Sequence, residues 1–186
     1  PLGSIELQVA FGPKGEYGSW LRTHHVAAVI NGMMFLHGGI SPSVAPLGCA
    51  GINEQARKEL ETIGTVALKS AADLLVTRED GPLWYRGLAV ENEATPAGDL
   101  TAMLEKLQAR AIVVGHTVTS NNRITTRSDG RVVQIDTGML GEAFYPGGRA
   151  SALEIQDGRF VAIYEDGREQ LPVRLITRND HSSDLR

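Results

Sequence analysis

The chain contains 186 residues with a mass of 20.0 kDa, and 42% of the residues are hydrophobic and 22% charged. This composition is typical of a globular domain and excludes disorder as an account of the whole chain. The formal net charge of -4 provides no basic surface for nucleic acid or an anionic membrane, so a phosphate-bearing substrate must be attracted locally, by a metal or a placed arginine.

The two ends of the chain differ in composition from its centre. Residues 1–4, Pro-Leu-Gly-Ser, look like the remnant of a cleaved expression tag, and we expect the native N-terminus to lie elsewhere. Residues 5–177 form one unit without internal repeats, and the polar residues 178–186 are expected to form a flexible tail. No run approaches the roughly 20 apolar residues of a membrane span, so we expect a soluble chain whose compartment the sequence leaves open.

A predicted β-hairpin follows a glycine-rich opening. Residues 5–19 contain several glycines and show little periodicity. They lead into two apolar runs, 25–30 and 33–37, which are separated by Asn31 and Gly32. Since Asn-Gly between apolar runs is the strongest short hairpin signal, the pattern predicts two paired strands.

Helices are predicted on both sides of the chain centre. Between Ile52 and Arg78, apolar residues recur at helical spacing with a break near Gly64, which predicts two helices. A third helix is expected over residues 99–109, with its leucines on one face. It leads directly into the β-rich apolar run 111–114, which is typical of a strand buried within a sheet.

The rest of the chain alternates between strand and turn patterns. Asp129-Gly130 and Asp157-Gly158 predict tight turns between neighbouring strands. The predicted strands are RITTRS (123–128), RVVQID (131–136), SALEI (151–155) and FVAIY (160–164). Helices followed by one buried strand and then several further strands indicate an α/β sandwich.

Two histidines stand where predicted strands end. His37 and His116 each follow a buried apolar run and have a glycine as neighbour, a placement typical of imidazole ligands held over the edge of a sheet. The alternative is that each is an ordinary polar residue with satisfied hydrogen bonds. The remaining histidines lie in polar runs, and we expect His24, His25 and His181 at the surface.

A third candidate lies in the segment GPLWYRG, residues 81–87. Arg86 stands between aromatic residues and glycine, and arginine provides a planar, bidentate grip on phosphate whose direction could be fixed by stacking on Trp84 or Tyr85. The alternative is an arginine packed over tryptophan as surface cover. Asp136 could accept a hydrogen bond from a histidine or serve as a turn residue, and its local sequence favours the turn.

Four short motifs join these residues into a resemblance to a known family. They are LHGGISP (36–42), GPLWYRG (81–87), VVGHT (113–117) and VVQIDTGM (132–139). Their order and spacing resemble those of the calcineurin-like metallophosphoesterases, most of all the Shewanella-like branch of the phosphoprotein phosphatases. The resemblance extends from Glu16 to about Glu165 and implies an α/β fold, the C-terminal half of a metallophosphoesterase β-sandwich with flanking helices.

The resemblance also implies roles for the candidate residues. His37 and His116 match the two histidines that bind the second metal of a dinuclear centre, whose two divalent ions are Mn, Fe or Zn. Arg86 matches the catalytic arginine that grips the substrate phosphate, and Tyr85 is a neighbour of weaker standing in the same substrate-binding segment. In such enzymes the two ions clamp the phosphate and activate a water, which attacks phosphorus directly.

One half of the family pattern does not occur in this sequence. The motifs GDxHG, GDxxDRG and GNHE, which supply the aspartates, the asparagine and the general-acid histidine, are all missing. Two neutral imidazoles without carboxylates hold a hard cation poorly, so we expect this chain alone to be inactive, and its sequence leaves open whether it binds metal.

Three functions remain open at this point. The first is part of a protein phosphatase that acts on a phosphorylated protein, and the second is part of a phosphoesterase for small phosphoesters such as dinucleoside polyphosphates. The third is a non-catalytic assembly module. Because a half-sandwich leaves an apolar face or a strand edge uncovered, we also expect a homodimer, a swapped assembly or a rearrangement of the first 25 residues.

Overall fold

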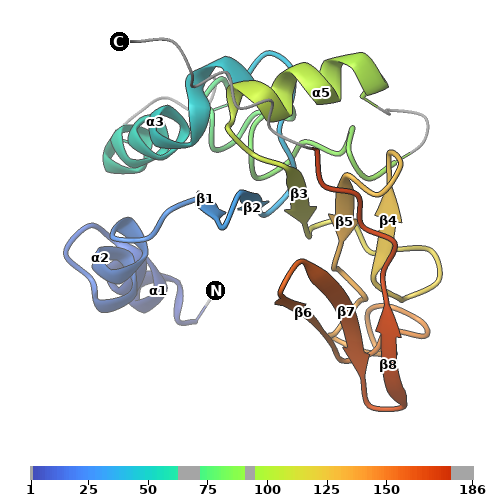
Figure 1. Ribbon diagram of the computed structural model, residues 1–186. Helices are drawn as coiled ribbons and strands as arrows, with labels where there is room; N and C mark the ends of the chain where they lie inside the picture. Colours follow the sequence, from blue (N-terminus) through green and yellow to red (C-terminus); the bar gives the residue numbers. More distant parts are fainter. Residues whose placement is uncertain (1, 63–71, 91–94, 177–186) are drawn as a thin grey trace, which may run out of the picture.

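The computed structural model describes residues 2–62, 72–90 and 95–176 (Figure 1). A five-stranded sheet with the order β1-β2-β3-β5-β4 forms its centre. The outer strands β1 and β4 run antiparallel to their neighbours, whereas β2, β3 and β5 run parallel to one another. The strand bounds are β1 Ala27–Ile30, β2 Met33–Leu36, β3 Ala111–Val114, β4 Thr125–Arg127 and β5 Val132–Gln134. The parallel centre matters for function because it brings three strand ends to one edge.

The predicted hairpin of β1 and β2 is confirmed. Asn31 and Gly32 both adopt positive φ, 51° and 78°, as a two-residue hairpin turn requires. Ile30 is therefore paired with Met33 directly across the turn. A side chain of Asn53 supports the other end of β1, since its Oδ1 accepts the backbone N–H groups of Val26 and Ala27 at 2.9 and 3.0 Å.

Two long helices cover one face of the sheet (Figure 1). They are α3, Gly48–Thr62, which follows a short 3-10 turn at Ala45–Leu47, and α5, Ala97–Lys106. The apolar core beneath them includes Met34, Ile112 and Val114 from the sheet, all fully or almost fully buried. The predicted helix 99–109 is confirmed in position, but it ends earlier because Gln108 turns to a positive φ of 54°.

The second helix predicted before Arg78 falls mostly on residues 63–71, which lie outside the described ranges. The described residues 72–78 form turns and bends, so no helix continues to Arg78. A buried glutamate on α3 holds this segment, since Glu59 Oε2 accepts the backbone N–H of Val76 at 3.1 Å. Leu75 and Val76 are both buried, which accounts for the apolar character of this stretch.

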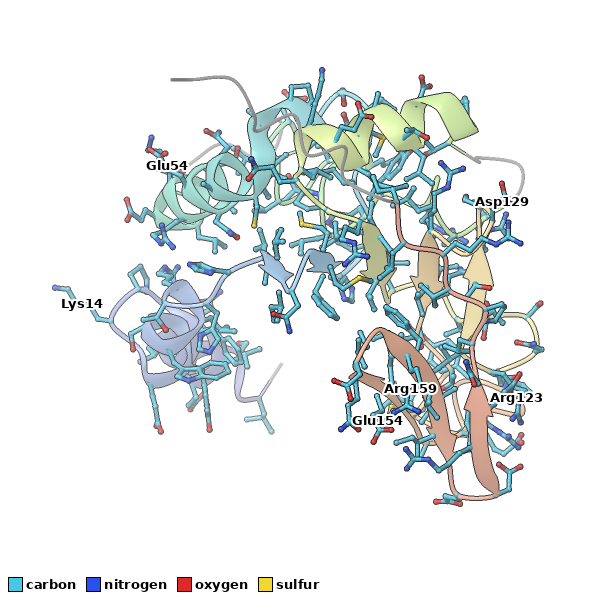
Figure 2. All side chains as sticks on the ribbon, viewed as in Figure 1. Lys14, Glu54, Arg123, Asp129, Glu154 and Arg159 are labelled. Atoms are coloured by element: carbon cyan, nitrogen blue, oxygen red, sulfur yellow. The ribbon has the colours of Figure 1, made fainter. Side chains whose placement is uncertain are left out.

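A three-stranded antiparallel sheet packs on the opposite face and completes the sandwich. It consists of β6 Ser151–Gln156, β7 Arg159–Tyr164 and β8 Gly167–Gln170. Alternate residues of β7 are buried against Ala111, Val113 and Val133. Charged side chains such as Arg123 and Glu154 flank this sheet (Figure 2): Arg123 pairs with Glu169 at 3.1 Å, and Glu154 pairs with Arg168. The strand β8 was not predicted, because its four residues are all exposed and carry no apolar pattern.

The glycine-rich opening is helical, which the sequence did not predict. It forms a hairpin of α1, Ser4–Phe11, and α2, Glu16–Arg22. Its glycines permit close packing of the two helices, since a Cβ built on Gly18 would lie 2.0 Å from the carbonyl oxygen of Gly12. No residue of α1 is buried, and Gly18 is the buried residue of α2. None of the helices in the described ranges is long and apolar enough to cross a membrane.

Candidate active site

The candidate site lies where the parallel strands β2 and β3 end. Leu36 is the register partner of Val114, so the residues that follow the two strands emerge side by side. The backbone N–H of Gly115 donates to the carbonyl of His37 at 2.8 Å and extends this pairing beyond the strands. As a result, His37 Nε2 lies 3.1 Å from His116 Nδ1, although the two residues are 79 positions apart. The predicted proximity of the two imidazoles is confirmed.

The backbone of His116 adopts an uncommon conformation that fixes its direction. Its φ is +64°, which few residues other than glycine adopt. The N–H of Thr117 donates to the carbonyl of Gly115 at 2.7 Å, so the three residues form a γ-turn centred on His116. Backbone strain of this kind costs about 1–3 kcal/mol and persists where the surroundings hold it, often at functional sites.

The electrostatic surroundings of His116 favour its neutral form. Burial lowers the pKa of this imidazole below its ordinary value, and the neighbouring His37 and Arg86 lower it further, while Asp136 acts in the opposite direction. Neutral imidazole is the form that binds metal ions. At neutral pH the side chain is therefore in the protonation state that a ligand requires.

The loop of residues 81–87 docks onto the backbone that follows His37. The N–H groups of Gly38 and Gly39 both point at the carbonyl of Pro82, at 2.9 and 3.3 Å. A Cβ built on Gly38 would lie 2.7 Å from the carbonyl of Leu83, so only glycine permits this approach. The two glycines of the motif after His37 therefore serve to seat the loop that carries Arg86.

Arg86 projects into an open cleft of about 620 Å³ beside the histidines. The cleft is lined by Glu79, Asp80, Trp84, Tyr85, Arg86 and His116. The side chain of Arg86 is exposed, and within the described ranges its guanidinium makes no ion pair or hydrogen bond. By contrast, the nearby Arg78 is paired with Asp80 at 2.7 Å. Arg86 is thus a cation of this cleft with its donors uncommitted.

The aromatic neighbours of Arg86 are engaged with other groups. The Trp84 indole N–H donates to the carbonyl of Val76 at 3.1 Å, and its ring meets that of His116 with centroids 5.4 Å apart. The Tyr85 hydroxyl is hydrogen bonded to Thr95 Oγ1 at 2.8 Å. The expected stacking of Arg86 on either ring is absent from the cation–π contacts of the described residues, and the contact between Trp84 and His116 was not predicted.

Asp136 serves as a turn residue, as its local sequence indicated. Its Oδ1 accepts the backbone N–H of Gly138 at 3.0 Å, which closes a local side-chain turn after β5. No hydrogen bond joins its carboxylate to either His37 or His116 in the described part of the chain. Asp136 therefore influences His116 through its charge rather than by direct contact.

The geometry of the histidine pair fits two ligand positions on one metal ion. Zinc lies about 2.0–2.1 Å from each imidazole nitrogen, so two tetrahedral ligand nitrogens are about 3.3 Å apart. The observed 3.1 Å agrees with this spacing. Among the described residues, however, no group of three or more histidine, cysteine, aspartate or glutamate side chains could hold an ion. This chain thus presents part of a coordination sphere.

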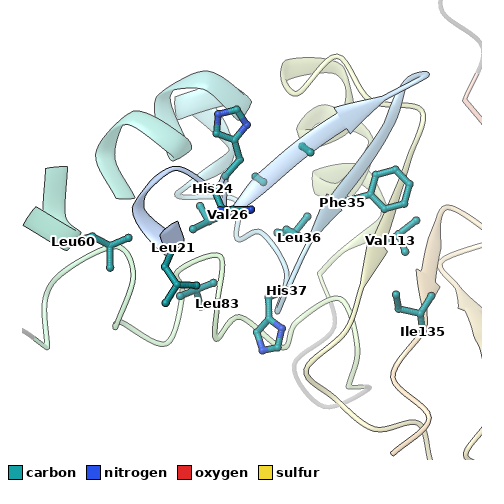
Figure 3. A pocket seen from close by; sticks show the side chains of 13 residues that line it. Leu21, His24, Val26, Phe35, Leu36, His37, Leu60, Leu83, Val113 and Ile135 are labelled. Carbon is teal, nitrogen blue, oxygen red and sulfur yellow. The ribbon is translucent and has the colours of Figure 1, made fainter. Parts of the chain in front are cut away.

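An apolar groove of about 570 Å³ lies next to the histidine pair (Figure 3). It covers the part of the sheet between α2 and the strand ends, and His37 stands at its border. Its lining consists mostly of aliphatic and aromatic side chains: Leu21, Val26, Ala27, Ala28, Phe35, Leu36, Leu60, Leu83, Val113 and Ile135, together with His24, His25 and His37. The groove therefore extends over the sheet from the helical hairpin of α1 and α2 to the strand ends.

Comparison with known proteins finds similarity to a protein phosphatase and to an uncharacterized protein. No protein-family model matches it. It is 27% identical over 154 residues to Shewanella-like protein phosphatase 1 of Plasmodium berghei, a match that spans 81% of this chain and 42% of the relative. It is also 29% identical over 157 residues to an uncharacterized protein of Schizosaccharomyces pombe, spanning 76% of this chain and 42% of that protein.

The fold is that of a solved Shewanella enzyme. The crystal structure of the cold-active protein-tyrosine phosphatase of a psychrophilic Shewanella species matches with a TM-score of 0.70 and 25% identity, over 86% of this chain and 46% of that one. The resemblance to Shewanella-like phosphatases and the metallophosphoesterase fold are therefore confirmed. The chain spans less than half the length of each relative that it matches.

Proposed function

We propose that this chain, similar in sequence and fold to the Shewanella-like protein phosphatases, is one part of a metal-dependent phosphatase that hydrolyses phosphomonoesters of proteins. One observation carries the proposal: two imidazole nitrogens from distant segments lie 3.1 Å apart, beside an arginine with uncommitted donors. The names of the relatives support the same class of reaction.

In this proposal His37 and His116 hold one ion of a dinuclear centre through Nε2 and Nδ1. When bound, the two ions supply Lewis acidity and an activated water for attack on phosphorus. Arg86 binds two phosphate oxygens with its planar fork and offsets the negative charge of the substrate. Burial and neighbouring charge lower the pKa of His116 and so favour its neutral form, the form in which an imidazole nitrogen can bind an ion.

The missing carboxylates lead to a second part of the proposal. Within the described ranges, no acidic side chain is hydrogen bonded to the histidine pair, and the carboxylate of Asp136 accepts the N–H of Gly138 instead. Because two neutral imidazoles do not neutralise a divalent cation, further ligands from beyond the described residues are required. We therefore propose that these 186 residues are catalytically inactive by themselves.

An activity assay tests both parts. Hydrolysis of p-nitrophenyl phosphate and of phosphopeptides is measured with added Mn²⁺, for the full-length protein and for this chain. We expect metal-dependent turnover in the full-length protein, its loss in His116→Ala, and none from the chain. Turnover of dinucleoside polyphosphates in preference to phosphopeptides would contradict the protein-phosphatase assignment, and robust metal-dependent activity of the chain alone would contradict the proposal that it is inactive.

A further inference from the structure

Trp84 is a large apolar side chain on the wall of the cleft, yet it is 49% exposed. Its indole N–H is bonded to the carbonyl of Val76, so the polar end of the ring already has its partner inside the protein. The rest of the indole ring is apolar and can make apolar contacts. A tryptophan anchored in this way holds one orientation although it is half-exposed.

The ring of His116 is one of the groups that Trp84 contacts. The two rings lie 5.4 Å apart at 85°, the edge-to-face arrangement that aromatic pairs favour. In the described part of the chain, the ring contacts of His116 are with Trp84 and with His37, the latter at 4.9 Å and 61°. Trp84 is thus the apolar ring contact of His116, whereas His37 is its polar ring contact.

This contact supplies a constraint that the backbone of His116 does not provide. The γ-turn sets the direction in which the side chain leaves the chain. It does not set the rotation of the ring about χ2, because that torsion is broad for imidazole. A neighbour must therefore decide whether Nδ1 or, after a half-turn of the ring, the carbon Cδ2 faces His37. The Trp84 ring is in position to hold the His116 ring in one of these orientations.

We propose that Trp84 is a positioning residue, which holds the His116 ring so that Nδ1 faces His37 Nε2. The consequence of this ring orientation for metal binding rests on the proposed function, whereas the contact between the two rings is independent of it. Trp84 and Arg86 are two residues apart on one loop, and that loop is fixed to the backbone after His37.

Imidazole NMR of the metal-free 186-residue chain tests the proposal. Long-range ¹H–¹⁵N spectra report the tautomer of each histidine, and His116→Gln assigns the His116 signal. We compare Trp84→Leu, which removes the aromatic ring, with Trp84→Phe, which keeps a ring but removes the N–H donor. The matched control is Trp20→Phe, because Trp20 stacks on His24 with centroids 4.0 Å apart on the helical hairpin.

We expect one His116 tautomer in the unmodified chain and a nuclear Overhauser contact between the Trp84 and His116 rings. Trp84→Leu should lose the ring-current shift and average the tautomers, Trp84→Phe should restore one tautomer, and Trp20→Phe should change only His24. An unchanged His116 spectrum in Trp84→Leu, or averaging in Trp84→Phe as well, would overturn the proposal. If Trp84→Leu does not fold, a missing Overhauser contact in the unmodified chain still overturns it.

Addition of Zn²⁺ to the full-length protein separates this inference from the proposed function. If Zn²⁺ shifts the signals of His37 and His116 together, both ideas stand. If Zn²⁺ shifts neither signal while the effects of the Trp84 variants remain, the metal assignment fails and the positioning role of Trp84 is retained as a property of the ring pair.

Discussion

Two regions of the molecule present accessible side chains, and these side chains differ in kind. At the ends of β2 and β3 they are polar and include Arg86 in the cleft and the histidine pair beside it. On the helical hairpin of α1 and α2 they are apolar and exposed: Ile5, Leu7, Val9, Phe11, Tyr17, Trp20 and Leu21.

The comparison shows how each kind of surface is held in place. Backbone hydrogen bonds define the polar site, from Gly115 to His37 and from Gly38 to Pro82, so its shape does not depend on a ligand. The hairpin has no such frame, and Arg22 attaches it to α3 through the carbonyl of Leu60 at 3.1 Å. An apolar surface is stabilised only by what covers it.

The apolar groove joins the two regions, since both Leu21 of the hairpin and His37 of the site line it. Any polypeptide that covers the apolar hairpin would therefore lie next to the surface where further ligands could reach the histidines. Single substitutions in the polar site should change catalysis or the pKa of a site residue. Single substitutions in the hairpin should change self-association of the chain. The following predictions test that difference.

The largest effect is expected at Arg86. In the full-length protein, Arg86→Ala should lower kcat/KM by about 10²–10³, the usual cost of one lost donor to developing phosphoryl charge. Arg86→Lys should fall between, because it keeps the charge but loses the planar fork. Steady-state kinetics measure this, with Arg149→Ala as the control, since Arg149 is paired with Asp166 on the second sheet. A loss no greater than that of the control would remove Arg86 from the site.

The hairpin should show its effect in self-association. We expect the chain to associate at micromolar concentration. Val9→Lys, on helix α1 where no residue is buried, should weaken association by about tenfold or more, because a charge is costly to bury in an apolar contact. Sedimentation equilibrium measures the constant. Phe144→Lys is the control, since Phe144 is equally exposed but lies elsewhere. A clean monomer at every concentration would show that the hairpin needs no cover.

A smaller effect is expected where the loop meets the strand end. Gly38→Ala forces a Cβ to within 2.7 Å of the Leu83 carbonyl and should destabilise the fold by about 1–3 kcal/mol. Gly98→Ala is the matched control, because its Cβ meets nothing within 4 Å and alanine in a helix should add about 0.5–1 kcal/mol. Thermal unfolding compares the two. Equal melting temperatures would mean that the loop does not sit on Gly38.

The smallest effect concerns pH. Since the pKa of His116 is lowered in the folded chain, folding favours the neutral imidazole, and its contribution to stability is present above the ordinary value of about 6.5 and lost as pH falls through the lowered pKa. Arg86→Ala should raise the pKa of His116 toward that ordinary value, because Arg86 is one cause of the shift. NMR titration measures it. An unchanged pKa in the variant would place Arg86 away from the imidazole.

The sequence predicted the polar site better than the hairpin for a physical reason. Apolar runs that end in glycine and histidine specify parallel strands and the residues at their ends, so the proximity of His37 and His116 followed from local patterns. The contact of Trp84 with His116 could not be predicted, because it depends on how a loop without periodicity docks on Gly38 and Gly39.

Three parts of the fold did not follow from local patterns. The helices α1 and α2 contain glycines that indicate turns, but Gly15 and Gly18 allow the two helices to approach each other. The apolar spacing before Arg78 resembled a helix, whereas the described residues there are held as turns by Glu59. The strand β8 has no apolar face, and its pairing with β7 alone defines it.

The central claim is that His37 and His116 bind the same divalent ion, and paramagnetic broadening tests it most directly. Mn²⁺ is titrated into the full-length protein while imidazole NMR signals are followed. The account predicts that His37 and His116 broaden together, before His24 and His25, and that His37→Ala abolishes the broadening of His116. If the two signals broaden independently, or if His116 broadens equally in His37→Ala, the shared metal site is contradicted.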